Sequence, residues 1–254
     1  NDRRMANDWR PEIHDSDGLS MHSGNGEWIW RPLSNPTRLS FNSFADRNPN
    51  GFGLLQRDRE FDHYQDDGVF YDKRPCLWVE PKDDWGEGAI QLVQIPTEDE
   101  TMDNIVAFWN PGQALRPGQE ALFGYRLYWG SKPPVQPALA TVAATRTGVG
   151  GVVGKKRTHY ALRFAVDFAG GPLALLDWAK TKVEPVITLT SGRAEISSAR
   201  PLASLKGARV MFDVAPAETP DPITMRLYLK SGGRSLSETW LYEWMPPALE
   251  ERKV

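Results

Sequence analysis

Two short acidic segments carry the residue types that could do acid–base chemistry. Residues 12–18 read EIHDSDG, and residues 97–104 read TEDETMDN. Two carboxyl groups can cleave a glycosidic bond when one protonates the leaving oxygen and the other activates water. Crowding of acids in one turn raises the pKa of at least one member, which would suit it to the acid role. The two segments therefore allow a glycosidase, and their spacing leaves open whether they meet in space.

Each segment also has a plain structural interpretation. Residues 12–18 could form an Asx turn with solvated carboxylates, and residues 97–104 a solvated acidic turn. A calcium loop of the EF-hand type would need further acidic ligands. A zinc site would need a second histidine at a familiar spacing from His14, whereas His22 and His63 are isolated. The sequence thus predicts no metal site and no cofactor.

Composition excludes several other classes of protein. A net charge of −3 provides no basic field for nucleic acid, and no run of about 18 apolar residues predicts a transmembrane helix. The glycines at 24–26 lack the lysine of a phosphate loop, and no G-x-S-x-G motif supports a serine hydrolase. Cys76 stands in the strand-like segment CLWV, which predicts a buried, unreactive thiol.

Tryptophan is frequent and unevenly distributed. Seven of the ten tryptophans fall within the first 131 residues. Aromatic rings supply core area, and they also supply flat apolar faces that can stack on sugar rings. We expect at least half of them to be core residues. Their concentration nevertheless indicates that the first part of the chain bears the site.

The elements that must position these residues are short strands. Apolar runs alternate with turn signals such as SNP, NPNG, DDG and NPG, and long helical periodicity is absent. This pattern predicts an all-β fold. The alternating charges of residues 57–60, RDRE, predict an exposed strand end, although arginines there could also contact a glycan. The expected strands are 27–31, 39–44, 52–56, 77–80, 89–95, 105–109, 121–128, 159–168, 183–190, 195–202, 208–214, 223–230 and 236–243.

Composition divides the chain into two domains. Residues 1–131 predict a β-sandwich with long loops, and residues 132–137, KPPVQP, a stiff linker. Residues 138–254 predict a smaller, Ig-like β-sandwich. The segment 144–157, ATRTGVGGVVGKKR, predicts an exposed loop. Because the chain starts at Asn1 without a signal peptide, we expect a processed form or a fragment of a longer protein.

Several consecutive segments resemble one family, the periplasmic glucan biosynthesis proteins OpgG and OpgD (MdoG and MdoD) of Gram-negative bacteria. The resemblance spans residues 3–131 and is carried by RRMANDWRPEIHDSDGL, GNGEWIWRPL, FGLLQRDREFDHYQD, YDKRPCLWVEP, WGEGAIQLVQIPTEDETMDNIVAFW and RLYWG. It implies a periplasmic protein. It also implies that the chain holds the C-terminal part of a large β-sandwich domain, followed by the Ig-like domain.

The resemblance also implies a substrate and a site. The family acts on osmoregulated periplasmic glucans with a β-1,2-linked glucose backbone, and OpgD-type members are similar to inverting endo-β-1,2-glucanases. By the family pattern, Asp103 matches the general acid and Asp15 the carboxylate proposed as base. Glu100 and Tyr71 match neighbouring site residues. The rings of Trp9, Trp28, Trp30 and Tyr71 are candidates for stacking on the glucan.

Two other hypotheses remain beside the glucanase. The protein could bind glucan without cleaving it, as a scaffold of the biosynthetic machinery. Its Ig-like domain would then dock a membrane glucosyltransferase or a second copy of the chain, giving a homodimer. Alternatively, both acidic segments could be solvated turns of a purely structural β-protein. The sequence does not separate OpgG-like from OpgD-like behaviour.

Overall fold

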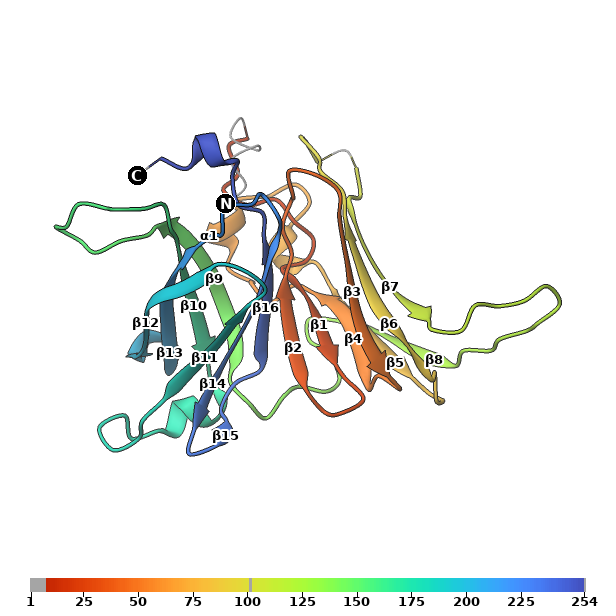
Figure 1. Ribbon diagram of the computed structural model, residues 1–254. Coiled ribbons are helices and arrows are strands. Elements are labelled where there is room, and N and C mark those ends of the chain that lie inside the picture. Colours follow the sequence, from red (N-terminus) through yellow and green to blue (C-terminus); the bar gives the residue numbers. More distant parts are fainter. Residues whose placement is uncertain (1–7, 101, 254) are drawn as a thin grey trace. The chain divides into compact units, whose positions relative to one another are not determined.

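The computed structural model describes residues 8–100 and 102–253, and within them strands dominate (Figure 1). The chain forms two compact units, residues 1–136 and residues 137–254, which are described separately below. Helix is limited to α1 (Phe61–Tyr64) and four short 3-10 turns among the described residues: η2 (Tyr71–Lys73), η3 (Gly171–Leu175), η4 (Ala203–Leu205) and η5 (Leu249–Glu251). Across this described part, no helix has the length and apolarity that a membrane crossing requires.

Unit 1 contains two antiparallel arrays of strands. The first runs in the order β2–β1–β4–β5–β8 and the second in the order β3–β6–β7. Their bounds are β1 (Gly18–His22), β2 (Trp28–Pro32), β3 (Ser40–Arg47), β4 (Gly51–Leu55), β5 (Cys76–Pro81), β6 (Glu87–Gln94), β7 (Ile105–Pro111) and β8 (Tyr125–Gly130).

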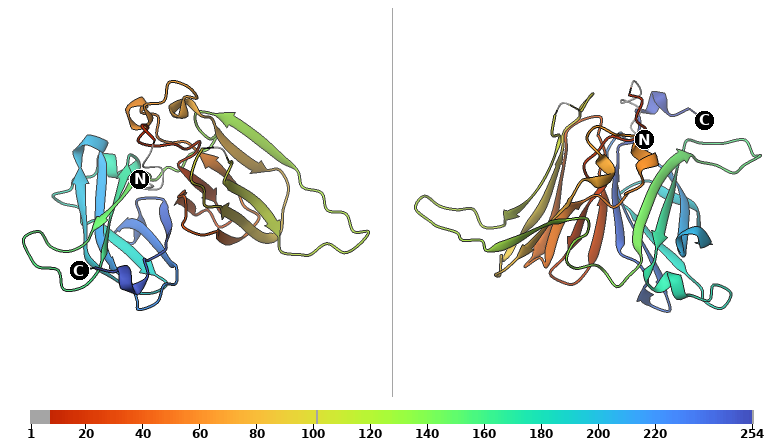
Figure 2. Two further views of the ribbon diagram at one scale, coloured as in Figure 1. Left: turned by 90° about the horizontal axis from the view of Figure 1, so that it is seen from above. Right: turned by 180° about the vertical axis from the view of Figure 1, so that it is seen from behind.

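Side chains from both arrays of unit 1 pack into one core. Leu19 and Phe52 come from the first array, and Ile90 and Leu92 from the second; all are almost fully buried. Alternation along each strand sends every second side chain to this interior, which is the period that the sequence shows. Figures 1 and 2 let the two arrays be followed from several sides.

Unit 2 also combines two antiparallel arrays. One has the order β12–β13–β10–β9, and the other β11–β14–β16, with β15 beside β14. Phe164, Phe212 and Trp240 meet in its core, with ring centroids 5.4–6.1 Å apart. The bounds are β9 (Thr141–Val149), β10 (Leu162–Ala169), β11 (Glu184–Leu189), β12 (Arg193–Leu202), β13 (Gly207–Ala215), β14 (Ile223–Ser231), β15 (Arg234–Ser235) and β16 (Thr239–Trp244).

The expected β character is confirmed, and every expected strand overlaps an observed one. Two longer strands, β1 and β9, were not expected. The loop predicted for residues 144–157 is wrong in its first part, because β9 pairs with β10 as far as Val149. The large sandwich and the Ig-like sandwich stay predictions, as does the assignment of residues 132–137 as a linker.

Candidate functional site

Three connections of unit 1 gather at one end of its strands. They are residues 8–17 before β1, residues 56–75 between β4 and β5, and residues 95–104 between β6 and β7. In antiparallel arrays the end of one strand lies beside the start of its neighbour, so these segments come together although they are far apart in sequence. Figure 1 shows them on the same side of the unit. Thr101 lies outside the described residues, as do residues 3–7 of the first family-like segment.

Glu100 is held by two partners from the other connections. Arg10 donates from Nη2 to Glu100 Oε2 at 2.5 Å and from Nη1 to Oε1 at 3.3 Å. The hydroxyl of Tyr71 also donates to Glu100 Oε1. The hydrogen bonds from Arg10 and then Tyr71 lower the pKa of Glu100. Crowding of the acidic turn was expected to raise a carboxyl pKa, so for Glu100 the direction is the opposite.

Tyr71 links Glu100 to Asp15. Its side chain is buried between two guanidinium groups, with the ring centroid 6.0 Å from Arg10 Cζ and 5.3 Å from Arg74 Cζ. Arg74 Nε in turn lies 3.0 Å from Asp15 Oδ1, and Asp15 is exposed. Burial, followed by the hydrogen bond to Glu100, raises the pKa of Tyr71, so the phenol stays a donor at neutral pH. Three predicted site residues therefore share one constellation.

Asp103 occupies a different setting. It is exposed near the end of the acidic turn, two residues before β7 begins. Among the described residues, Asp103 makes no hydrogen bond or ion pair, and no contact joins it to Asp15. Its carboxyl group is therefore accessible to a ligand from solvent.

The tryptophans divide into core and surface. Trp28 stacks between His22 and Trp78, with centroids 4.2 Å and 5.8 Å away, and is 8% exposed. Trp30 is 3% exposed and is covered by the guanidinium of Arg57, 3.6 Å from the ring centroid. Neither ring offers a free face to a sugar, so both are core residues and their predicted stacking role is corrected.

Trp9 differs from these two rings, because 69% of it is exposed. It lies next to Arg10, whose guanidinium carbon is 5.8 Å from the indole centroid. Of the three predicted tryptophans, Trp9 alone keeps a face for a sugar. Its neighbour Arg10 binds Glu100, which ties this ring to the constellation around Tyr71.

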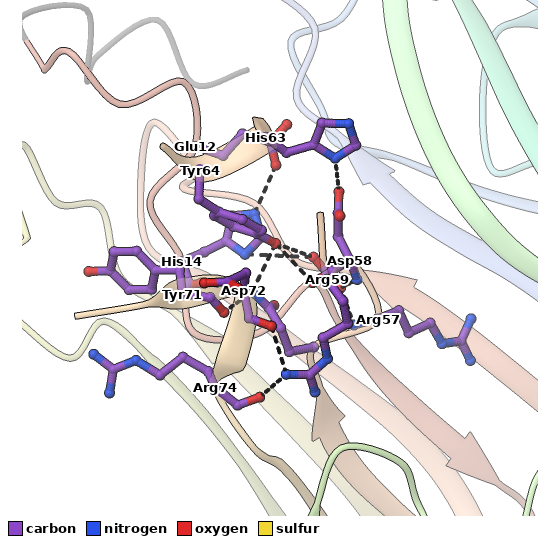
Figure 3. Close-up of polar contacts among 12 residues, drawn as sticks. Glu12, His14, Arg57, Asp58, Arg59, His63, Tyr64, Tyr71, Asp72 and Arg74 are labelled. Atoms are coloured by element: carbon purple, nitrogen blue, oxygen red, sulfur yellow. Dashed lines mark hydrogen bonds and ion pairs between the residues drawn. The ribbon is translucent and has the colours of Figure 1, made fainter. Parts of the chain in front are cut away.

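A polar network that the sequence did not predict surrounds His14, the residue before Asp15 (Figure 3). His14 Nε2 lies 3.1 Å from Glu12 Oε2, and His14 Nδ1 lies 3.6 Å from Asp17 Oδ1. Burial lowers the pKa of His14, but the hydrogen bond to Glu12 and the charge of Asp17 outweigh it and raise the pKa overall. Burial raises the pKa of Asp17. Tyr64 packs edge-on against the His14 ring, with centroids 5.2 Å apart.

The RDRE segment is part of this network, which corrects its prediction as an exposed strand end. The backbone N–H groups of Arg57 and Asp58 both donate to Asp17 Oδ2, the latter at 2.7 Å. Arg59 donates to the carbonyl oxygens of Asp72, at 3.1 Å, and of Arg74. Alternating charge hid this role, because periodicity does not reveal a guanidinium that binds backbone carbonyls.

A separate groove lies on the β3–β6–β7 array. It is wide open to solvent, has a volume of about 530 Å³ and is lined by residues such as Ser43, Asp46, Glu87 and Asn110. Glu87 begins β6, whereas the acidic turn follows the other end of that strand. The groove contains none of the predicted site residues. Within residues 8–100 and 102–253, no cluster of three or more histidine, cysteine or acidic side chains could hold a metal ion.

The comparisons with known proteins find glucan biosynthesis proteins. A family model described as "Periplasmic glucan biosynthesis protein, MdoG" matches residues 1–244. The chain is 67% identical over 257 residues to glucans biosynthesis protein D of Xylella fastidiosa (strain M12), covering all of this chain and 48% of that protein. It is 66% identical over 249 residues to glucans biosynthesis protein D of Stenotrophomonas maltophilia (strain K279a), covering 97% of this chain and 46% of that protein. The chain thus spans about half the length of these curated relatives.

Proposed function

Because the chain belongs to the MdoG family of periplasmic glucan biosynthesis proteins, we propose that it processes a β-1,2-linked glucan as an inverting endo-β-1,2-glucanase. The family assignment confirms the resemblance read from the sequence, and it agrees with the predicted periplasmic location. The linkage and the hydrolytic step come from that resemblance. Since the chain covers about half of its relatives, the activity is proposed for the whole protein.

Asp103 and Asp15 take the two carboxyl roles in this proposal. Asp103, protonated, gives its proton to the glycosidic oxygen as the C–O bond breaks. Asp15, ionised, receives a proton from the attacking water, directly or through a relay. Inverting enzymes space the two groups about 6.5–9.5 Å apart so that the water fits between them and the sugar. The exposure of both aspartates supports access to substrate and water.

One observation carries the proposal, namely that Tyr71, Glu100 and Asp15 lie in one constellation. The hydroxyl of Tyr71 donates to Glu100, and Arg74 lies beside both Tyr71 and Asp15. This arrangement brings three family-pattern residues from three separate connections into one place. Such convergence of acids, guanidinium groups and an aromatic hydroxyl suits hydrogen bonding to sugar hydroxyls. Glu100 and Tyr71 would then orient the glucan, and exposed Trp9 would stack on one of its rings.

A second candidate is a glucan-binding scaffold without hydrolysis. The relatives are named for glucan biosynthesis, which describes assembly of the polymer and not its cleavage. In this version the same side chains only hydrogen-bond the glucan. Unit 2 would contact a membrane glucosyltransferase or a second copy of the chain.

Replacement of the proposed acid, Asp103, tests the choice between a glucanase and a glucan-binding scaffold. Full-length wild type, Asp103→Asn and Glu98→Gln are incubated with linear β-1,2-glucan, and shorter oligosaccharides are quantified by chromatography. Loss of the proton donor is expected to lower turnover about 10²–10³-fold, because general acid catalysis contributes that much. Glu98→Gln removes an exposed acid of the same turn and is expected to keep wild-type turnover.

Three results would redirect the proposal. Wild-type turnover in Asp103→Asn would show that Asp103 is not the acid. Calorimetric binding of the glucan by the wild type without any product would favour the scaffold. Neither binding nor cleavage would remove both candidates and leave the structural interpretation of the acidic turns.

A further inference from the structure

The side chain of Gln56 lies where two of the site connections meet. The residue follows the last residue of β4 and is fully buried. One connection carries Asp15 and the other carries Tyr71. Gln56 belongs to the family-like segment FGLLQRDREFDHYQD, but no site role was predicted for it, and burial keeps its amide from contacting a substrate. Its contacts are entirely with the protein interior.

The amide nitrogen of Gln56 holds both connections at once. Nε2 lies 3.2 Å from the carbonyl oxygen of His14, 3.1 Å from the carbonyl oxygen of Tyr71 and 2.8 Å from the hydroxyl of Tyr64. Carbonyl oxygens only accept hydrogen bonds, so the NH₂ group must face them. The opposite orientation of the amide would place its oxygen against two other acceptors. The arrangement thus fixes which way Gln56 points.

Each backbone group that Gln56 binds adjoins a predicted site residue. His14 directly precedes Asp15 in sequence. The other carbonyl belongs to Tyr71, whose hydroxyl binds Glu100. A single buried side chain therefore spaces the backbone of Asp15 from that of Tyr71. Side-chain contact between the two is indirect, through exposed Arg74, which by itself gives a weaker constraint.

Surrounding residues hold Gln56 in place. Tyr64 is buried, and its hydroxyl also reaches Asp17 Oδ1 at 3.5 Å and the Asp58 carbonyl at 3.4 Å. The thiol of Cys76 donates to the Gln56 carbonyl at 3.5 Å. Figure 3 shows how the neighbours His14, Tyr64 and Tyr71 lie. Gln56 is thus held at its backbone carbonyl from β5 and at its side-chain amide from the helical connection.

We propose that Gln56 is a positioning residue, which sets the distance between Asp15 and the Tyr71–Glu100 pair by bracing the backbone at His14 and Tyr71. This role rests on the proposed function of Asp15 and Tyr71. It adds a residue outside the acid, the base and their substrate contacts. Displacement of a reacting group by about 1 Å can lower turnover about 100-fold, so the brace has a measurable consequence.

Two substitutions test the brace. Gln56→Leu fills similar space and removes both donors. Gln56→Glu keeps the shape but turns oxygen atoms toward two carbonyl groups. The control is Asn48→Ala, in the turn between β3 and β4, at the opposite end of β4 from Gln56. It removes the side-chain oxygen that accepts from Gly86 N at 2.6 Å, so it also costs an amide hydrogen bond in unit 1.

The readouts are kcat and KM on linear β-1,2-glucan in the full-length protein, together with crystal structures of the variants. Both Gln56 variants are expected to lower kcat about 10–100-fold with KM changed less than about threefold. Their structures are expected to show Asp15 displaced from Tyr71. Asn48→Ala is expected to lower Tm without lowering kcat.

The outcomes separate this inference from the proposed function. If the wild type cleaves glucan and Gln56→Leu keeps its kcat, the brace is wrong while the glucanase stands. If the wild type binds without cleaving, the glucanase is wrong, and the same variants are compared by Kd, with at least tenfold weakening expected. An unchanged separation of Asp15 and Tyr71 in the variant structures overturns the brace in either case.

Discussion

In unit 2 the buried carboxylates of Asp167 and Asp213 each face an arginine directly across the β10–β13 pair, whereas in unit 1 the polar groups around Asp15 are incompletely matched. Arg209 binds both oxygens of Asp167 at 2.6 Å and 2.8 Å, and Arg163 binds both oxygens of Asp213 at 2.6 Å and 2.9 Å. Such bidentate pairs satisfy the carboxylate. The two pairs join β10 to β13 and so stabilise this sheet.

The polar network of unit 1 leaves hydrogen-bonding atoms unused. His14 Nδ1, Gln56 Oε1, Arg59 Nε and Asp72 Oδ1 are buried without a hydrogen-bond partner among the described residues. Throughout the described part of unit 2, by contrast, no buried side-chain polar atom lacks a partner. Unsatisfied buried groups are costly and call for an explanation such as a functional site. Among the described residues, the bidentate ion pairs thus stabilise a sheet of unit 2, whereas the buried atoms without partners lie in unit 1.

Arg163→Met gives the largest expected effect on stability. Among the described residues it leaves buried Asp213 with one donor, the Gly151 N–H at 2.7 Å, and removal of one partner from a buried pair costs about 3 kcal/mol or more. The free energy of unfolding, measured by denaturant titration, should fall by that amount while glucan turnover persists. The double variant Arg163→Met/Asp213→Leu should recover most of the loss. If Arg163→Met were as stable as the wild type, the pair with Asp213 would not stabilise unit 2, and the proposed difference between the two units would be wrong.

Arg74→Met should behave in the opposite way. Its ion pair with Asp15 is exposed on both sides, with side chains 38% and 60% accessible, so its loss should cost less than about 1 kcal/mol. If the connections of unit 1 serve the glucan, turnover should nevertheless fall at least tenfold. Denaturant titration and the glucan assay together measure both. A large loss of stability with full turnover would make Arg74 structural, like Arg163.

A pH titration of stability gives the smallest effect. Arg10 and Tyr71 keep the pKa of Glu100 below its usual value of 4.5. A carboxyl pKa lowered by folding stabilises the protein above the unfolded pKa, and this contribution is lost as pH falls through the folded pKa. The Tm of wild type should therefore exceed that of Glu100→Gln at pH 6–7, and the gap should narrow as the pH falls below 4.5 and through the lowered pKa of Glu100.

The control for this titration is Glu98→Gln, which changes an exposed acid of the same turn. Its Tm should follow the wild type over the whole pH range. A gap for Glu100→Gln that widens as the pH falls would mean that Arg10 and Tyr71 do not favour the ionised carboxylate. The contacts of Glu100 would then match neither those expected in a binding site nor the arginine–aspartate pairs of unit 2.

The sequence predicted the strands well, and the roles of the site residues stay a prediction. Alternating apolar residues marked β13 and β14 within one residue of their bounds, because side chains on a strand must alternate between interior and solvent. It missed β9, since glycines and basic residues weaken that signal and pairing with β10 supplies what the local pattern lacks. The acidic turn and the HDSDG segment were visible as clusters because their members are adjacent in sequence.

Family pattern singled out Asp103, Asp15, Glu100 and Tyr71, while the packing decided what surrounds them. Trp30 and Trp9 are the same residue type in similar polar segments, yet one is in the core and the other is 69% exposed. Burial depends on which strands pack against each other, and the residue type alone does not determine that packing. The sequence could therefore predict both rings as candidates for stacking on a sugar, and only the fold shows which of them is exposed.

What the sequence alone determined is the β character of the chain, its family and the acidic residues suited to glycosidic chemistry. Only the tertiary structure decided that Tyr71, Glu100 and Asp15 share one constellation and that Gln56 lies beneath it. These hydrogen bonds join residues 15 to 90 positions apart and depend on strand pairing, which local periodicity does not encode. A glutamine between two strands is unremarkable in sequence, and its importance follows from the two carbonyl groups that it binds.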